Sequence, residues 1–456
     1  MTQQKPAKKT PKGFDQVRAA AVKALLDIEK GEQADAAIRA AVKEKGLRPI
    51  DLRFLSQLVN GATKMRRRLD HEIKFYLARP SVKLEPAIQN ILRLGFYQLS
   101  YTDRVPDAAA VSESVNLARH FADESRARLV NAVMRSRLRE PEKVHFVPVE
   151  DNPAKHLGDK YSYPDHFVEF CLSEFGVERT TRLLEHYNRP PTACYRVNFL
   201  KIKPEKVAEM LSEEEIEFSP GKYLPEFLHL TKSGLPLENE LIRTGNVFVQ
   251  NESSGLAPKL LNPRPGANVA DLTAAPGGKA TYMAIRMRNR GRITAIDKSR
   301  PRLELLVDNT QRLGIRIISP VFADLEEFSG GPFDRVLLDP PCTGWGAAGK
   351  HSDLRWSKTG RDIDNLVKVQ TMMIDRAARL VKPGGILVYS TCTIIRNEND
   401  EIVEQFLLRN DKFEIESADR VLPSELVSER GFLKTYPDFD NLEGAFCARL
   451  KRRQNR

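Results

Sequence analysis

Two cysteines follow two apolar segments at positions where thiol chemistry is possible. Cys342 comes shortly after the run Val336–Leu338, and Cys392 comes shortly after Ile386–Tyr389. Each run is typical of a buried parallel strand. Because ligands of an open α/β sheet bind at the carboxyl ends of its strands, both thiols are expected at that edge. Cysteine is the side chain best able to act as a nucleophile near neutral pH, although position alone fits two buried structural cysteines equally well.

A loop of small residues lies upstream of both cysteines. The predicted strand Asn268–Leu272 runs into the loop Thr273–Lys279, and a predicted helix, Ala280–Arg288, follows. Two glycines let the backbone approach a ligand closely, and the start of the helix favours a negative group. The next predicted strand, Arg292–Ile296, ends at Asp297. A carboxylate at this distance from a glycine loop is placed to bind ribose hydroxyls.

The third predicted strand ends at Phe322, and Asp324 behind it could accept a hydrogen bond from an adenine amino group. The loop is not GxGxxG, so a single adenosine-bearing ligand such as S-adenosylmethionine fits better than a dinucleotide. For each aspartate alone, a turn-forming role at a strand end is the alternative. The candidate cofactor-binding residues are Thr273, Ala274, Ala275, Pro276, Gly277, Gly278, Lys279, Asp297, Asp324 and Asp339.

Three motifs in this region resemble those of a known family. Ala-Ala-Pro-Gly-Gly-Lys at 274–279, Asp-Pro-Pro-Cys-Thr-Gly at 339–344 and Ser-Thr-Cys-Thr at 390–393 resemble motifs of the RNA cytosine-5 methyltransferases of the NOP2/Sun family. Their order and spacing match throughout 245–450. Small departures occur: Thr273 stands where the family often has Cys, and Thr343 and Trp345 vary a Ser-Gly stretch.

The N-terminal part carries a second resemblance. The segments 48–55, 94–99 and 129–135 are similar to the helical fold of the antitermination factor NusB. A NusB-like domain ahead of such a methyltransferase is the layout of bacterial 16S ribosomal RNA cytosine-5 methyltransferases. The resemblance therefore implies an RNA substrate and S-adenosylmethionine as the methyl donor.

The implied chemistry explains why two thiols are needed. Carbon 5 of cytosine is a poor nucleophile until a thiolate adds to carbon 6. In the family the nucleophile is the cysteine of the Thr-Cys motif, here Cys392, while the cysteine of the Pro-Cys motif, here Cys342, assists product release. Asp339 would hydrogen-bond the cytosine edge. Since a free cysteine has a pKa near about 8.5, the site must stabilise the thiolate, and Lys279 is one candidate.

Two basic regions are candidate RNA contacts. The segment Trp345–Lys358 holds both tryptophans of the chain together with basic residues, and such a rim loop suits the grip of single-stranded RNA. For Trp345 and Trp356 themselves, a structural role is the more common alternative to stacking on a base. The residues Lys64, Arg66, Arg67 and Arg68 form a dense cluster on a predicted helix, where phosphate contact is expected rather than a merely solvated face.

Composition sets the broad class. The formal net charge is +11: residues 1–150 carry +10, residues 151–450 carry −3 and the tail 451–456 carries +4. A basic N-terminal region predicts a polyanionic partner, and the Lys-rich start could add a nonspecific arm. Five cysteines without a CxxC pair indicate neither a disulfide framework nor a metal site. No apolar run is long enough to span a membrane. We expect a cytoplasmic monomer without membrane or metal; Cys171, Cys194 and Cys447 are expected to be core residues.

The chain should divide into three parts. Residues 14–140 show helical spacing throughout and predict an all-α, NusB-like RNA-binding domain. Residues 155–262 mix helices (167–187 and 204–213) with strands (193–198 and 245–250), which predicts linker helices and a small α+β, RRM-like subdomain. Residues 263–450 alternate strands and helices, which predicts a Rossmann-like α/β methyltransferase domain with a parallel doubly wound sheet. The leading hypothesis is cytosine-5 methylation of 16S ribosomal RNA. The alternatives are the same chemistry on transfer RNA and a noncatalytic RNA-binding assembly factor.

Overall fold

The structure is a computed structural model that describes residues 14–45, 47–81, 83–231, 234–236, 239–440 and 442–454. The Lys-rich start (Lys5, Lys8, Lys9 and Lys12) and Arg456 therefore lie outside the described residues. The chain packs as two units. The helical unit runs up to Asn188 and includes the later segment His351–Ser357, and the sheet unit contains 189–350 and 358–456.

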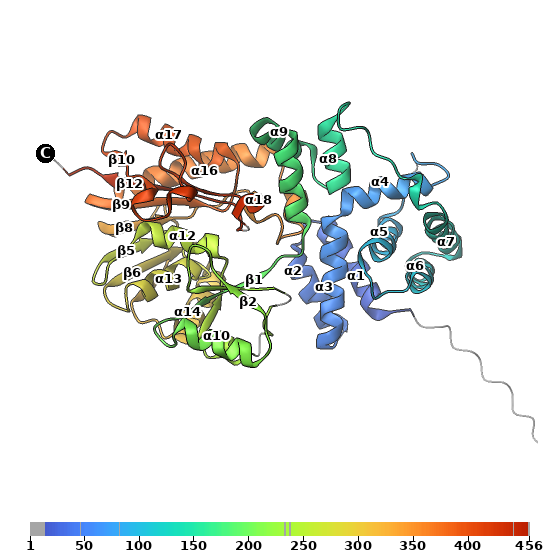
Figure 1. Cartoon of the computed structure of the whole chain (residues 1–456), viewed down its shortest axis with the longest axis horizontal. Coiled ribbons are helices and arrows are strands. Elements are labelled where there is room, and N and C mark those ends of the chain that lie inside the picture. Colours follow the sequence, from blue (N-terminus) through green and yellow to red (C-terminus); the bar gives the residue numbers. More distant parts are fainter. Residues whose placement is uncertain are drawn as a thin grey trace, which may run out of the picture. The chain divides into compact units, whose positions relative to one another are not determined.

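The helical unit consists of α-helices joined by short connections (Figure 1). Ala21 and Leu25 of the first helix are buried, as are Ile88, Ile91 and Leu92 of the fifth, so the predicted apolar spacing marks the core faces correctly. Side-chain caps start three of the helices, because Asp15, Asp123 and Asn152 each accept a backbone N–H three residues ahead. The helices are α1 (Gln16–Glu29), α2 (Ala34–Lys45), α3 (Pro49–Lys64), α4 (Arg66–Tyr76), α5 (Pro86–Tyr101), α6 (Asp107–Phe121), α7 (Glu124–Arg139), α8 (Pro153–Tyr161), α9 (Asp165–Asn188) and, in the later segment, α15 (Leu354–Ser357).

A small antiparallel sheet opens the sheet unit. Its strands lie in the order β2-β3-β1-β4, and their inner faces form an apolar core with Val207 and Leu211 of helix α10. The predicted helix 204–213 has these bounds in the structure, since Pro204 fixes its first turn. The elements are β1 (Ala193–Val197), α10 (Pro204–Glu213), β2 (Phe218–Pro220), β3 (Phe227–Leu230), α11 (Glu240–Arg243) and β4 (Val247–Val249).

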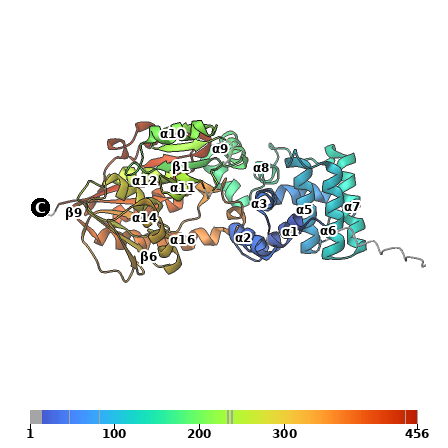
Figure 2. The same cartoon turned by 90° about the horizontal axis from the view of Figure 1, so that it is seen from below.

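The larger sheet has the order β10-β12-β9-β8-β5-β6-β7, with β11 paired to β12 (Figures 1 and 2). Its strands β7-β6-β5-β8-β9 are parallel, as predicted. The strand order reverses between β5 and β8, because β6 and β7 lie on one side of β5 and β8 and β9 lie on the other. Ligands of doubly wound sheets bind at such a reversal. The strands are β5 (Asn268–Asp271), β6 (Arg292–Asp297), β7 (Ile318–Phe322), β8 (Phe333–Leu338), β9 (Val381–Thr391), β10 (Phe413–Ile415), β11 (Leu433–Thr435) and β12 (Ala445–Arg452).

Helices cover both faces of this sheet. Along β8 and β9, Leu337 and Val388 pack into one core with helices α12 and α13, and their neighbours Leu338 and Tyr389 pack into the other core with α16 and α17. This alternation explains why the strands read as continuous apolar runs. The helices are α12 (Glu252–Leu261), α13 (Gly278–Arg286), α14 (Arg300–Leu313), α16 (Gly360–Arg379), α17 (Asp400–Arg409) and α18 (Pro437–Asp440).

The antiparallel strands β10, β11 and β12 were not predicted. Strand β12 pairs with β9 over Phe446–Lys451 and extends the sheet beyond its parallel part. Among the described residues, no helix is long and apolar enough to cross a membrane.

Candidate active site

The two cysteines singled out by the sequence meet at the carboxyl ends of β8 and β9. The Sγ atoms of Cys342 and Cys392 lie 3.3 Å apart. Cys392 is exposed, whereas Cys342 is half-buried. Because β8 and β9 are hydrogen-bonded neighbours running in the same direction, the loops that follow them leave the sheet side by side.

The two thiols have different protonation behaviour. The hydrogen bond with Cys392 and burial raise the pKa of Cys342 well above its ordinary value. The protonated form of Cys342 is therefore favoured, and its thiol can donate to the sulfur of Cys392. Cys392 is the exposed sulfur that a substrate can reach.

Lys279 and Asp339 form an ion pair beside these thiols, with Lys279 Nζ and Asp339 Oδ2 at 2.5 Å. Burial alone would lower the pKa of Lys279, but Asp339, Cys392 and Asp271 together raise it. Lys279 is therefore a permanent positive charge next to Cys392. This position supports the expected stabilisation of a thiolate at Cys392.

The loop Thr273–Lys279 is held at the ends of β5 and β6. The amide of Ala274 donates to the Ile296 carbonyl at 2.8 Å. Gly277 has a φ of +106°, and a Cβ there would lie 3.2 Å from Cγ of Leu306, so a side chain would be both strained and crowded. Helix α13 begins at the next residue, Gly278.

The two aspartates predicted to hold an adenosine group occupy different environments. Asp297 is buried, and its carboxylate accepts from the amides of Ala275, at 3.1 Å, and Ser299, at 2.9 Å. It thus lies against the loop as expected. Asp324 is exposed after β7, and its Oδ1 accepts from the Glu326 amide at 3.0 Å in a local turn.

Asp271 was missed by the sequence reasoning. It ends β5, is fully buried, and neither of its carboxylate oxygens has a hydrogen bond of normal geometry. Burial raises the pKa of Asp271 to about 7, and Lys279 and the Thr273 amide oppose this only in part. A buried, unpartnered carboxylate beside a glycine loop is a place for a cationic group of a ligand. Its position directly before the loop was the available signal.

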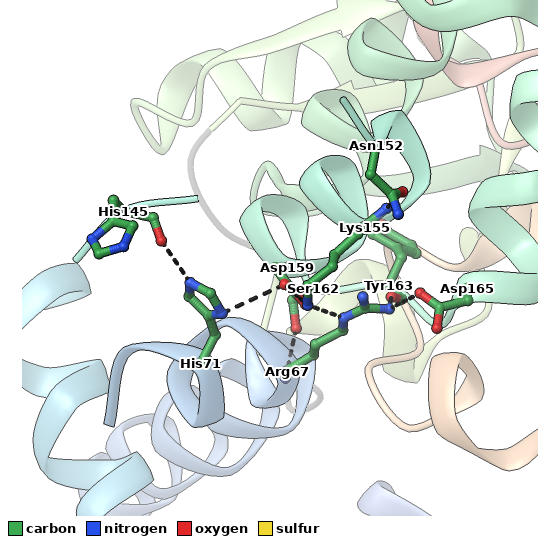
Figure 3. A network of polar contacts seen from close by, with 9 residues as sticks. All are labelled: Arg67, His71, His145, Asn152, Lys155, Asp159, Ser162, Tyr163 and Asp165. Carbon is green, nitrogen blue, oxygen red and sulfur yellow. Dashed lines mark hydrogen bonds and ion pairs between the residues drawn. The ribbon is translucent and has the colours of Figure 1, made fainter. Parts of the chain in front are cut away.

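The side chains of the basic cluster that was predicted to contact RNA have partners within the helical unit, most clearly Arg67 (Figure 3). Its guanidinium binds Asp159 at 2.7 Å, Asp165 at 2.6 Å and the Tyr163 carbonyl at 2.7 Å. A Cβ on Gly158 would lie 2.6 Å from the guanidinium carbon, so only glycine admits this packing. Arg67 therefore joins α4 to α8 and α9 instead of facing RNA.

The rest of the cluster is also engaged within the helical unit. Lys64 Nζ donates to the Tyr187 carbonyl at 3.1 Å, and burial together with Arg355 lowers the pKa of Lys64 to about 7. Arg68 pairs with Glu72 at 2.9 Å. The guanidinium of Arg66 stacks over the ring of Trp356, 5.6 Å from its centroid. The acceptors lie mostly on α8 and α9, far along the chain, which local charge density does not reveal.

In the loop Trp345–Lys358, both tryptophans have the structural role that was the alternative to stacking on RNA. Trp345 is fully buried and cannot stack on a base. Trp356 donates from Nε1 to the Thr63 carbonyl at 2.7 Å. Arg355 is fully buried in the helical unit, 3.9 Å above the Tyr163 ring, and donates to Asn188 at 2.8 Å. Both tryptophans thus serve packing.

The remaining cysteines fit the expectation of core residues. Cys171, Cys194 and Cys447 are buried. Burial raises the pKa values of Cys194 and Cys447 to about 12, so both stay as thiols. The described residues contain no group of His, Cys, Asp and Glu side chains suited to a metal ion.

Comparison with known proteins identifies each part of the chain. Residues 258–451 match the family model 16S rRNA methyltransferase RsmB/F. Residues 15–139 match the NusB family, and residues 163–236 match the RsmF/B-like methyltransferase ferredoxin-like domain. The expected fold class is confirmed: a NusB-like helical domain, a small ferredoxin-like α+β domain and a Rossmann-like methyltransferase domain.

Full-length relatives and solved structures agree with these matches. The Bacillus subtilis (strain 168) "Probable ribosomal RNA small subunit methyltransferase B" is 31% identical, covering 96% of this chain and 99% of its own. The protein of the same name from Synechocystis sp. (strain ATCC 27184 / PCC 6803 / Kazusa) is 34% identical over 94% and 97%. The crystal structure of PH0851 has a TM-score of 0.79 with 27% identity, covering 96% of this chain and 98% of its own. A methyltransferase homolog protein from Pyrococcus horikoshii has a TM-score of 0.57 with 30% identity, covering 66% and 99%.

Proposed function

Because the chain belongs to the ribosomal RNA small subunit methyltransferase B family, we propose that it methylates carbon 5 of a cytosine in 16S ribosomal RNA, using S-adenosylmethionine. The observation that carries the cytosine-5 assignment is the 3.3 Å separation of the Cys342 and Cys392 sulfurs beside the Lys279–Asp339 ion pair. Methylation of an oxygen or an exocyclic nitrogen needs no thiol nucleophile, whereas activation of carbon 5 does.

The residues at the end of β5 fit the proposed methyl donor. S-adenosylmethionine, when bound, supplies an electrophilic methyl group. The unpartnered carboxylate of Asp271 suits its ammonium group, because the pair would satisfy a buried charge that otherwise has no partner. Asp297 is assigned to the ribose hydroxyls and Asp324 to the adenine amino group, with the backbone of the loop Thr273–Lys279 between them. The carboxylate of Asp297 keeps lone pairs beyond the two amides it already accepts.

We assign the nucleophilic step to Cys392. Its thiolate would add to carbon 6 of the cytosine, forming the carbon–sulfur bond, while the electron pair of the ring double bond makes carbon 5 nucleophilic. Lys279 and Asp339 would hydrogen-bond the cytosine edge and supply a proton to ring nitrogen 3 as negative charge develops there. Carbon 5 can then accept the methyl group.

We assign product release to Cys342. While Cys392 is a thiolate, its hydrogen bond is the largest cause of the raised pKa of Cys342. Once Cys392 is bonded to carbon 6 it is no longer charged, and this cause disappears. Cys342 can then lose its proton to solvent and accept the proton of carbon 5. The carbon–sulfur bond breaks, Cys392 leaves as a thiolate, and ring nitrogen 3 returns its proton to the Lys279–Asp339 pair, so that the neutral aromatic ring is restored.

The substrate assignment rests on the family and on the helical unit. The relatives that match over nearly their whole length are named for the small ribosomal subunit, and residues 15–139 match the NusB family. We propose that residues 14–140 form an RNA-binding domain, that 155–262 form the linker helices and small subdomain, and that 263–450 form the methyltransferase domain. The cluster around Arg67 is engaged internally, which favours RNA binding by other residues of the helical domain.

Bisulfite sequencing tests this proposal. Ribosomal and transfer RNA would be isolated from a strain that lacks the gene, and from the same strain complemented with the intact chain or with Cys392→Ala. We expect one cytosine of 16S ribosomal RNA to lose its 5-methyl mark in the deletion strain and to regain it only with the intact chain. If the lost mark is instead in transfer RNA, the substrate is transfer RNA and not 16S ribosomal RNA. No lost mark in either RNA would contradict the proposed activity.

A further inference from the structure

The loops of Cys342 and Cys392 share a buried carboxylate neighbour that the proposed mechanism does not use. Glu398 ends a short 3-10 helix, Arg396–Glu398, that follows β9, and its side chain is fully buried. In the part of the chain that the structure describes, no basic side chain pairs with it. A buried carboxylate is costly unless several donors compensate it, so its hydrogen bonds indicate what it holds in place.

Each oxygen of Glu398 accepts from a group next to Cys342. Oε1 accepts from the hydroxyl of Thr343, and Oε2 accepts from the Thr343 amide at 2.8 Å. Oε2 also accepts from Nε2 of Gln370 at 2.9 Å. The same Gln370 amide donates to the Pro341 carbonyl at 2.9 Å. The residues on both sides of Cys342 are therefore fixed by Glu398, one directly and one through Gln370.

A hydroxyl relay connects this carboxylate to the second cysteine loop. The hydroxyl oxygens of Thr343 and Thr393 lie 2.8 Å apart. Thr343 has one hydroxyl proton and gives it to Glu398, so the proton between the two threonines must come from Thr393. The Thr393 oxygen in turn accepts from the Ile395 amide at 3.2 Å. The relay thus has a fixed direction that ends at the carboxylate of Glu398.

The neighbouring Asn399 completes the hold on the loop of Cys392. Its Nδ2 donates to the Thr393 carbonyl at 2.9 Å, and its Oδ1 accepts from the Thr391 hydroxyl at 2.5 Å. The backbone of Glu398 is fixed as well, since its carbonyl accepts from the Tyr389 hydroxyl at 2.7 Å. The dipeptide Glu398–Asn399 therefore contacts residues on either side of Cys392.

We propose that Glu398 is the positioning residue that sets the separation of the two thiols, acting through Thr343 and Thr393. The catalytic part of this inference rests on the proposed function, because it assumes that Cys392 attacks carbon 6 while Cys342 lies within reach of carbon 5. The geometric part of the inference does not depend on the proposed function. It concerns the Cys342–Cys392 distance alone, which is measurable in the purified protein without any RNA.

A thiol–disulfide titration of the full chain is sensitive to that distance, because it gives the effective concentration of one thiol at the other. Glutathione disulfide oxidises the Cys342–Cys392 pair; two thiols become one disulfide, and two molecules of reduced glutathione are released. Peptide mass mapping identifies the disulfide, and the equilibrium constant gives the effective concentration of one thiol at the other. We expect Glu398→Gln and Thr393→Val to lower this constant by about tenfold or more, because both cut the relay. The matched controls Thr393→Ser, which keeps the hydroxyl, and Glu401→Gln should leave it within about twofold of the parent value.

Steady-state methylation kinetics form the second readout. We expect kcat to fall by about 10- to 100-fold in Glu398→Gln and Thr393→Val, with the KM for S-adenosylmethionine unchanged, because only the thiol geometry is lost. Thr343→Val combined with Thr393→Val should be no worse than either alone, since both interrupt one relay. If Glu398→Gln fails to fold, the threonine variants and their serine control carry the test.

The outcomes separate the inference from the proposed function. An unchanged redox constant in both Glu398→Gln and Thr393→Val would overturn the positioning role, as would a parent chain that forms no Cys342–Cys392 disulfide at all. A redox constant that falls as expected in a parent chain without methylation activity would keep the positioning role and remove the proposed chemistry instead.

Discussion

The hydroxyl of Thr273 forms two hydrogen bonds with the backbone of Asp339, donating to its carbonyl at 2.9 Å and accepting from its amide at 3.2 Å. Thr273 follows β5 and Asp339 follows β8, the two strands between which the strand order reverses. The Thr273 side chain therefore connects the cofactor loop to the loop of Cys342. The family often has Cys at this position, and a thiol is a weaker partner for both groups.

Thr273→Val should therefore destabilise the protein and loosen the two loops. The change leaves the amide and carbonyl of Asp339 without these partners, which costs about 1–3 kcal/mol. Denaturant unfolding measures the loss, and Thr273→Ser, which keeps the hydroxyl, is the control. Equal stabilities of the valine and serine variants would mean that the tie contributes nothing.

Cofactor binding should depend on pH through Asp271. Burial raises the pKa of Asp271 to about 7, so the empty site binds a proton below that pH and becomes a carboxylate above it. A cationic ligand group binds the charged form, and affinity should weaken by up to about tenfold for each unit of pH below 7. Calorimetric titration with S-adenosylhomocysteine tests this. Asp271→Asn should bind weakly with no such slope, and a flat profile in the parent chain would exclude Asp271 from the site.

Asp297→Ala should weaken binding of S-adenosylhomocysteine more than binding of RNA. Loss of a charged hydrogen-bond partner costs about 1.5–3 kcal/mol. Asp324→Ala is the matched comparison, because Asp324 is exposed and should contribute less. An unchanged dissociation constant in Asp297→Ala would assign this residue only to its amide contacts with Ala275 and Ser299.

Arg67→Ala should lower stability instead of RNA affinity. The change removes the ion pair of Arg67 with the largely buried Asp159, and breaking a pair of this kind costs about 3 kcal/mol. The pair with the exposed Asp165 contributes at most about 1 kcal/mol. Under conditions where the variant is folded, the salt dependence of RNA binding should match that of the parent chain. A salt dependence of RNA binding that is weaker by the equivalent of about one phosphate contact would show that Arg67 does contact RNA, as the sequence predicted.

The sequence predicted the parts of the fold that local patterns encode. Helix α10 has its predicted bounds because Pro204 fixes its start, and β7 ends at Phe322 as expected. The apolar runs before Cys342 and Cys392 were sufficient to predict two buried parallel strands with both cysteines at the same edge of the sheet. The pairing of these strands as neighbours, which brings the thiols into contact, is a finding of the structure.

The remaining features depend on partners distant in the chain. The basic cluster was expected to contact RNA phosphates, yet Asp159 and Asp165 pair with Arg67 from helices more than ninety residues later. A carboxylate at a strand end has the same local pattern whether it forms a turn, as Asp324 does, or is buried without a partner, as Asp271 is. Burial of Trp345 likewise follows from tertiary packing.

Cys392→Ala should abolish methyl transfer and leave binding of S-adenosylhomocysteine nearly unchanged, because the thiol is needed only for addition to the base. A tritiated-methyl assay beside calorimetry separates the two effects. Retained turnover would assign the nucleophile to another residue.

The most direct measurement uses Cys342→Ala, denaturing electrophoresis and ribosomal RNA. If Cys342 removes the carbon 5 proton, addition and methyl transfer should proceed in this variant while elimination stalls with Cys392 still bonded to the RNA. We predict a covalent protein–RNA species that requires S-adenosylmethionine and is absent from the Cys342→Ala/Cys392→Ala double variant. Normal turnover of Cys342→Ala without any such species would contradict the two-cysteine mechanism.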